Sequence, residues 1–167
     1  MYNKNMKRFL IFTLLIFFIQ IAEAETYNIG VSIEHVPKAL FGSWRVKAIL
    51  DTTNSPTLFI PKSIDVWELS RINNTLKLNN PMNGANAEIA IQTVEDKIIV
   101  FSKKTPYDEN KILTDTVTIR LENDKFSGIN SLKLETFSLI DKKLLKTETA
   151  NYKISGEKIA GENILHD

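Results

Sequence analysis

The chain has 167 residues, a formal net charge of +1 from 21 basic and 20 acidic side chains, and no cysteine. A near-neutral chain without a basic block lacks the electrostatic footprint of a nucleic-acid-binding protein. It also lacks the polybasic cluster of a protein that binds anionic membranes. The absence of cysteine excludes disulfides and thiolate zinc sites, so the fold must be held by its core.

Residues 1–24 are predicted to be a cleavable signal peptide. Three basic residues precede an apolar run over 9–21, small residues stand at Ala22 and Ala24, and the chain turns polar at Glu25. The run of 13 residues is short for a bilayer span, which needs about 20. An uncleaved N-terminal anchor is the alternative, and the lack of cysteine argues against a lipid anchor. With a composition typical of a bacterial source, we expect export to the periplasm or the extracellular space.

The segment after the signal peptide suits one domain. It has 143 residues with 18 basic and 19 acidic side chains, and a chain of this length can bury a sizeable core. We expect an N-terminal lead-in over 25–40, a β-barrel domain over 41–161 and a flexible tail over 162–167. A short helical turn is expected within His35–Phe41, with Pro37 near its start, and it would plug one end of the barrel.

Short runs rich in β-branched and aromatic residues recur after residue 40 and are separated by polar turns. Sustained helical periodicity and βαβ units are absent from this part of the sequence. The pattern predicts an all-β, antiparallel up-and-down meander of about eight strands that closes into a barrel, because closure removes exposed sheet edges. Residues 128–130 are expected to bulge or break a strand, and 105–110 to form a loop. The expected strand segments are 44–50, 64–72, 75–78, 87–94, 97–103, 113–121, 125–128, 132–137, 144–154 and 158–160.

A barrel in the outer membrane is disfavoured by charge. Such a barrel needs an apolar band about 25 Å tall on the lipid face of every strand. Charged side chains interrupt both faces of the early strands, and they are Arg45, Lys47, Glu68, Arg71, Lys77 and Glu88. We therefore expect no stable membrane insertion once the signal peptide has been cleaved.

The segment Phe41-Gly42-Ser43-Trp44 opens the first expected strand. It resembles the Gly-x-Trp signature of the lipocalin-like (calycin) β-barrels, in which the glycine permits a tight turn into the strand and the tryptophan closes the barrel floor. The resemblance covers roughly residues 40–160. It implies structural roles for Gly42 and Trp44, and it implies a fold without naming a ligand.

The chain departs from that family in its other motifs. Lipocalin-like barrels place a basic residue late in the chain over the tryptophan, and Lys153 and Lys158 are the candidates here. A second signature between the middle strands is absent from the sequence. Avidin-type biotin sites use several spaced tryptophans, whereas this chain has only Trp44 and Trp67.

Metal, haem and nucleophilic chemistry are not expected. The two histidines are His35, which precedes the barrel, and His166, which is the penultimate residue. A histidine in a terminal tail is usually solvated, and a Ser-His-Asp triad needs a histidine on structured backbone. A Gly-x-Ser-x-Gly motif is also absent from the sequence. We therefore predict no cofactor and no metal ion.

Paired carboxylates of the kind that glycosidases use are available in the sequence. The candidate pairs are Asp65 with Glu68, and Asp115 with Glu135. All four lie among charged or polar neighbours, and the favoured interpretation places them on the solvated exterior of the barrel. No catalytic residue is therefore predicted, and an enzyme is the third and poorest hypothesis.

The leading hypothesis is non-catalytic binding of a small, mostly apolar molecule inside the barrel. Trp67, Phe101 and Phe137 are the candidates to line its cavity, and core or cross-strand packing is the alternative role for these rings. The competing hypothesis is a structural or protein-interaction module with a solid-packed barrel that acts through its outer face or its loops over 51–63 and 81–86. Alternation alone leaves the inward face of each strand open, because a one-residue shift of register exchanges the faces.

Overall fold

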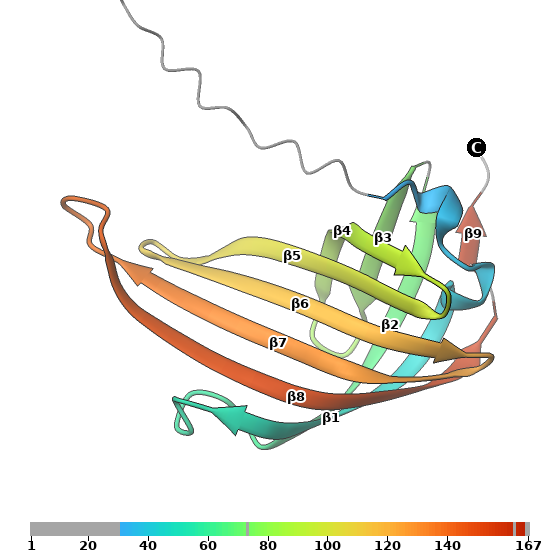
Figure 1. Ribbon diagram of the computed structural model, residues 1–167, viewed down its shortest axis with the longest axis horizontal. Helices are drawn as coiled ribbons and strands as arrows, with labels where there is room; N and C mark the ends of the chain where they lie inside the picture. The colour runs from blue at the N-terminus through green and yellow to red at the C-terminus, as the bar shows by residue number, and fades with distance from the viewer. Residues whose placement is uncertain (1–30, 73, 162, 166–167) are drawn as a thin grey trace, which may run out of the picture.

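The computed structural model describes residues 31–72 and 74–161 and the backbone of 163–165. Within these residues, eight antiparallel strands follow one another in an up-and-down meander, and β1 pairs with both β8 and β2, which closes a barrel (Figure 1). The predicted fold class is confirmed. The strands are β1 (Gly42–Thr53), β2 (Lys62–Ile72), β3 (Thr75–Asn80), β4 (Ala85–Glu95), β5 (Ile98–Asp108), β6 (Lys111–Glu122), β7 (Lys125–Phe137) and β8 (Leu144–Ala160).

A short strand follows the barrel. β9 (Asn163–Leu165) runs parallel to β2 and pairs with Ser70–Ile72, which is the stretch of β2 beyond its ladder with β1. No helix among the described residues is long and apolar enough to cross a membrane. The signal peptide expected over 1–24 and the histidine His166 lie outside the described residues.

Burial settles which face of each strand points inward. On β6, Val117, Ile119 and Leu121 are buried, whereas Thr118 and Arg120 between them are exposed. This is the period-two alternation expected of a strand with one face on the core. The inward faces of the strands together form one apolar core.

The expected interruption at Gly128–Asn130 is wrong, because β7 is a continuous strand through these residues. Gly128 pairs with Ile119 on one side and with Ile154 on the other. A Cβ atom built on Gly128 would lie 2.0 Å from the Thr118 carbonyl oxygen. Glycine therefore marks a close approach of two backbones here and not the end of a strand.

The expected loop over 105–110 is also mostly strand. β5 continues through Pro106 to Asp108, and this outer part of β5 pairs with β6. Proline is tolerated in a strand where one edge needs no N–H donor. The outer part of β5 meets that condition, because its ladder with β4 covers only Ile98–Ser102.

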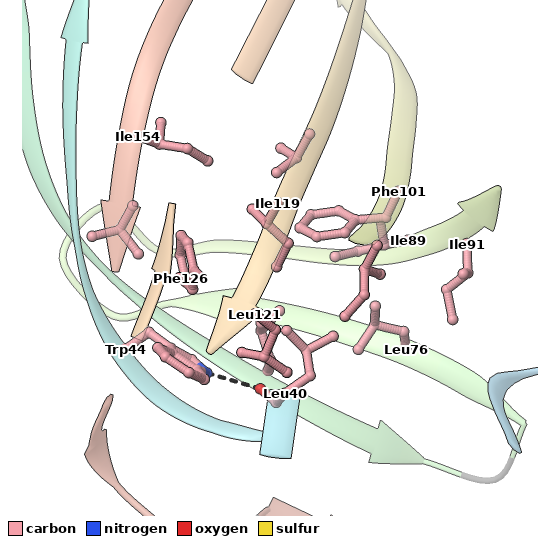
Figure 2. Close-up of a cluster of buried hydrophobic side chains, with 14 of the residues drawn as sticks. Leu40, Trp44, Leu76, Ile89, Ile91, Phe101, Ile119, Leu121, Phe126 and Ile154 are labelled. Carbon is pink, nitrogen blue, oxygen red and sulfur yellow. Dashed lines mark hydrogen bonds between the residues drawn. The ribbon is translucent and has the colours of Figure 1, made fainter. Parts of the chain in front are cut away.

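One end of the barrel is closed by the segment that precedes β1. The short 3-10 turns η1 (Ile33–His35) and η2 (Lys38–Leu40) lie across this end, and Pro37 is the N-cap of η2 (Figure 1). The side chains of Ile33 and Leu40 are buried in the core. Trp44 is fully buried beside them, and its Nε1 donates a hydrogen bond to the Leu40 carbonyl oxygen at 2.8 Å (Figure 2).

A lysine from the end of β8 completes this floor. The Lys158 ammonium lies 5.1 Å from the centroid of the Trp44 ring and donates a hydrogen bond to the Phe41 carbonyl oxygen at 3.1 Å. Lys153, the other candidate, forms an ion pair with Asp51 at 2.6 Å instead. Lys158 is therefore the basic residue that covers the tryptophan.

Gly42 is required by the turn into β1. Its φ angle is +134°, and a Cβ atom there would lie 2.4 Å from the Gly161 carbonyl oxygen. A side chain at this position would have to adopt a disfavoured backbone conformation and push the end of β8 away.

We expect Gly42→Ala to lower the free energy of unfolding by about 2–4 kcal/mol, because strain and collision act together. Gly84→Ala is the matched control: Gly84 also has a positive φ angle, +72°, but a Cβ atom there meets nothing within 4 Å. The control should cost only about 1–2 kcal/mol. Urea unfolding followed by tryptophan fluorescence measures both, and equal losses would contradict the role given to the contact with Gly161.

We expect Lys158→Met to lower the free energy of unfolding by about 1–2 kcal/mol, because it removes a charged hydrogen bond and a cation–π contact while retaining the apolar stem. Lys153→Met removes only an exposed ion pair and should change stability by less than about 0.5 kcal/mol. The same unfolding measurement separates them. A larger loss of unfolding free energy in the Lys153 variant would show that the Lys158 charge over Trp44 does not stabilise the fold.

Candidate functional site

The barrel wall splits between β4 and β5 at the end opposite the 3-10 turns. Throughout residues 85–108, all of which the structure describes, the β4–β5 ladder extends only from Glu95/Ile98 to Ala90/Ser102. Beyond this point β4 continues beside β3, and β5 continues beside β6. The strands β5 to β8 therefore extend past the closed part of the barrel as a curved sheet (Figure 1).

A cavity of about 370 Å³ lies inside the barrel next to this split. Its volume is at the lower end of the range of small-molecule sites. Its apolar lining consists of Trp67, Leu78, Ala85, Ala87, Ile89, Phe101, Leu113, Val117 and Leu132. Its polar lining consists of Asp65, Asn80, Asn83, Ser102, Lys103, Asp115 and Asn130.

The structure brings together two of the three aromatic residues proposed to line a cavity. Trp67 from β2 and Phe101 from β5 both line it, with ring centroids 6.5 Å apart in an edge-to-face arrangement. Phe101 lies beside Ile89 within the apolar cluster (Figure 2). Phe137 is not among the lining residues, because it lies at the outer end of β7, opposite Leu144.

Much of the polar lining lies one layer nearer the split end than an apolar lining residue, but Leu113 on β6 and Leu132 on β7 lie farther out than Asp115 and Asn130. On each of four strands, an apolar lining residue is followed two positions toward the split end by a polar one. Residues two apart on a strand share a face, so each pair points into the same cavity. The pairs are Trp67 with Asp65, Leu78 with Asn80, Phe101 with Lys103, and Val117 with Asp115. We call Asp65, Asn80, Lys103, Asp115 and Asn130 the polar belt.

Asp115 is the belt acid contributed by β6. Burial raises the pKa of its carboxyl group, and the hydrogen bond from Asn130 and the charge of Lys103 only partly oppose this effect. Asn130 Nδ2 donates to the Asp115 carboxylate and also lies 3.4 Å from the Thr116 carbonyl oxygen. Lys103 stands directly opposite Asp115 in the β5–β6 ladder.

Asp65 is oriented by a second asparagine. Asn80 Nδ2 donates to Asp65 Oδ1 at 3.1 Å, and Asn80 Oδ1 accepts from the Met82 backbone N–H at 3.0 Å. The side chain of Asn80 is buried, so its orientation is fixed by these two contacts. Each belt carboxylate is thus held by an asparagine from a neighbouring strand.

The carboxylate pairs considered from the sequence do not form at this site. Glu68 accepts a hydrogen bond from Asn79 at 2.5 Å, and Glu135 forms an ion pair with Lys133 at 3.0 Å. Neither glutamate lines the cavity, whereas Asp65 and Asp115 both do. The interpretation of Asp65 and Asp115 as exterior residues is therefore wrong.

The signal for the belt was present in the sequence. The period-two spacing puts Asp65 on the face of Trp67, Lys103 on that of Phe101, and Asp115 on that of Val117. When the aromatic and aliphatic residues of a strand face the inside of the barrel, the charged residues two positions away face the inside as well. Recognising this requires the inward face of each strand, which burial alone shows.

The described residues hold no group of three or more histidine, cysteine, aspartate or glutamate side chains arranged to bind a metal ion. Comparison with known proteins adds no family, since no family model, no curated protein and no solved structure matches this chain. The site must therefore be interpreted from its own geometry.

Asp115 predicts a specific pH dependence. Its pKa is higher in the folded chain than in the unfolded chain, so the folded state holds its proton to higher pH, and stability falls as the pH rises through that range. Asp115→Asn removes this loss. The free energy of unfolding of the variant minus that of the wild type should therefore increase from about pH 3 to about pH 7 in urea titrations.

Glu157→Gln is the control of opposite sign. The Arg45 guanidinium lowers the pKa of the Glu157 carboxyl group, so the ionised form stabilises the fold and this contribution is lost as the pH falls. The same difference should decrease with rising pH for this variant. A flat or decreasing profile for Asp115→Asn would show that the burial of Asp115 does not penalise its charge.

Proposed function

We propose that this chain is an exported, non-catalytic barrel that binds a small, mostly apolar molecule in the cavity that strands β2 to β7 line. The single observation that carries the proposal is the cavity of about 370 Å³ behind the β4–β5 split, with its apolar lining. The signal peptide predicted over residues 1–24 supports export.

The lining suits an apolar ligand for a physical reason. Each methylene group transferred from water to an apolar site contributes about 0.8 kcal/mol, so a chain or ring of several carbons gains substantial binding free energy there. The Trp67 and Phe101 rings, in edge-to-face contact, provide a wall of two aromatic residues that pack against other apolar side chains. A few polar groups at one end would orient the ligand.

The closed end supports a lipocalin-like arrangement of the barrel. Gly42 makes the turn into β1, Trp44 is fully buried at the floor, and Lys158 lies over its ring. These are the structural roles that the Gly-x-Trp resemblance implies. This supports membership of that class of barrel but says nothing of the ligand.

The alternatives have less support. A module with a solid-packed barrel needs an interior filled by side chains, whereas this interior contains the cavity. Catalysis by a carboxylate pair was considered for Asp65 with Glu68 and for Asp115 with Glu135, and neither glutamate lines the cavity. Asp65 and Asp115 both line it, but each is held by a different asparagine, Asn80 and Asn130. Binding without catalysis therefore accounts for more of the described geometry.

Filling the cavity tests the proposal. The neutral apolar fluorophore N-phenyl-1-naphthylamine should bind the wild-type chain with an increase in its emission. Ala87→Phe adds a ring at a lining position and should weaken this binding by about tenfold or more, which is about 1.4 kcal/mol. Fluorescence titration measures the affinities, and far-UV circular dichroism checks that the variant has folded.

Ala90→Phe is the matched control, because Ala90 lies on the same strand but is exposed and does not line the cavity. It should bind the fluorophore as the wild type does. The proposal is overturned if the wild type binds no fluorophore, or if the Ala87 and Ala90 variants bind it equally well.

A further inference from the structure

We propose that the cavity selects an amphiphile with a cationic amine head group. The head group would lie at the polar belt of Asp65, Asn80, Lys103, Asp115 and Asn130, and the apolar tail would lie against Trp67 and Phe101. This inference rests on the proposed function and names the class of ligand.

The order of the lining residues sets the direction of the ligand. Phe101 stands opposite Val117 in the β5–β6 ladder, and Lys103 stands opposite Asp115 one layer nearer the split end. On β2, Asp65 likewise lies one layer outside Trp67. A ligand that enters through the split tail first therefore places its tail against Trp67 and Phe101 and its head group beside Asp65 and Asp115, where Leu113 and Leu132 also line the cavity.

The hydrogen bonds within the belt leave acceptors for the ligand. Asn130 directs its amide group at Asp115 and at the Thr116 carbonyl, and Asn80 directs its amide group at Asp65. Among the described residues, these are the side-chain hydrogen bonds that the two carboxylates receive. A carboxylate accepts about four hydrogen bonds, so both acids retain acceptor capacity toward the cavity, and a head group that donates is favoured.

The charges of the belt favour a cation over a neutral donor. Asp65 and Asp115 contribute two negative charges and Lys103 contributes one positive charge. Lys103 stands opposite Asp115 in the β5–β6 ladder, and among the described residues no ion pair joins either carboxylate to a lysine or arginine. An ammonium group supplies three N–H donors and one positive charge, whereas a fatty-acid carboxylate would meet two like charges.

The burial of Asp115 is independent support. Burial raises the pKa of its carboxyl group because the ionised form is poorly solvated there. A positive head group within a few ångströms would stabilise that ionised form. Binding of an amine would thus lower the cost of ionising Asp115 in the folded chain.

Three ligands that share one tail test the selection: dodecylamine, dodecanol and dodecanoate, each displacing N-phenyl-1-naphthylamine from the wild-type chain at about pH 7. We expect the amine to bind about tenfold more tightly than the alcohol, and the carboxylate to bind most weakly. In the double variant Asp65→Asn/Asp115→Asn, the amine should bind no more tightly than the alcohol, and alcohol affinity should change by less than about threefold.

Asp124→Asn is the matched control, because Asp124 is an exposed acid in the turn between β6 and β7 and does not line the cavity. It should retain the preference for the amine. Equal or tighter binding of the alcohol or the carboxylate by the wild type would overturn this inference but leave the proposed function standing. Persistence of the amine preference in the double variant would have the same effect. Failure of all three ligands to bind would overturn both.

Discussion

The double pairing of β1 is the constraint on which the rest of the structure depends. β1 pairs with β8 on one side and with β2 on the other, so every strand between them has its register fixed around a closed ring. A shift of one residue would exchange inward and outward faces. The closed end of the barrel stabilises this pairing. Trp44, near the start of β1, donates a hydrogen bond to the Leu40 carbonyl oxygen, and Lys158 from β8 lies over its ring.

The fold follows from local rules that act along the chain, which is why the sequence predicts it well. Alternation, turn residues and the Gly42–Trp44 segment give the strands, their order and the closed end. The predictions that are wrong concern segments whose structure depends on backbone contacts with strands far away in the sequence. Gly128 suggests a break, but its lack of a side chain is needed because the Thr118 carbonyl lies against it, and nothing near Gly128 in the sequence encodes that contact. Pro106 suggests a loop, but it lies in a part of β5 that has lost β4 as a partner.

The candidate site is harder to predict because it depends on where two strands part. Trp67 and Phe101 are conspicuous in the sequence, and both line the cavity. Phe137 is equally conspicuous, yet it lies far out on the sheet that extends past the split. The separation of β4 and β5 beyond Ser102 is marked in the sequence only by Pro106, a residue typical of a strand with one unpaired edge. The aspartates of the belt, Asp65 and Asp115, are evident in the sequence, but their polar neighbours suggest the outer face of the barrel, whereas both line the cavity.

Asp115 is a part of the belt whose burial the fold itself does not require. A carboxyl group whose pKa is raised by burial destabilises the folded chain at neutral pH, and a neutral amide could accept the same hydrogen bond from Asn130 without that cost. The core below it reaches full burial with apolar side chains alone, as Ile99 and Leu69 do, and at the height of Asp115 the cavity is also lined by Leu132, which is its partner in the β6–β7 ladder. A ligand that binds only the folded chain and neutralises the group would offset the cost. Under the proposed function, Asp115 would contribute to ligand binding at the expense of the stability of the folded chain.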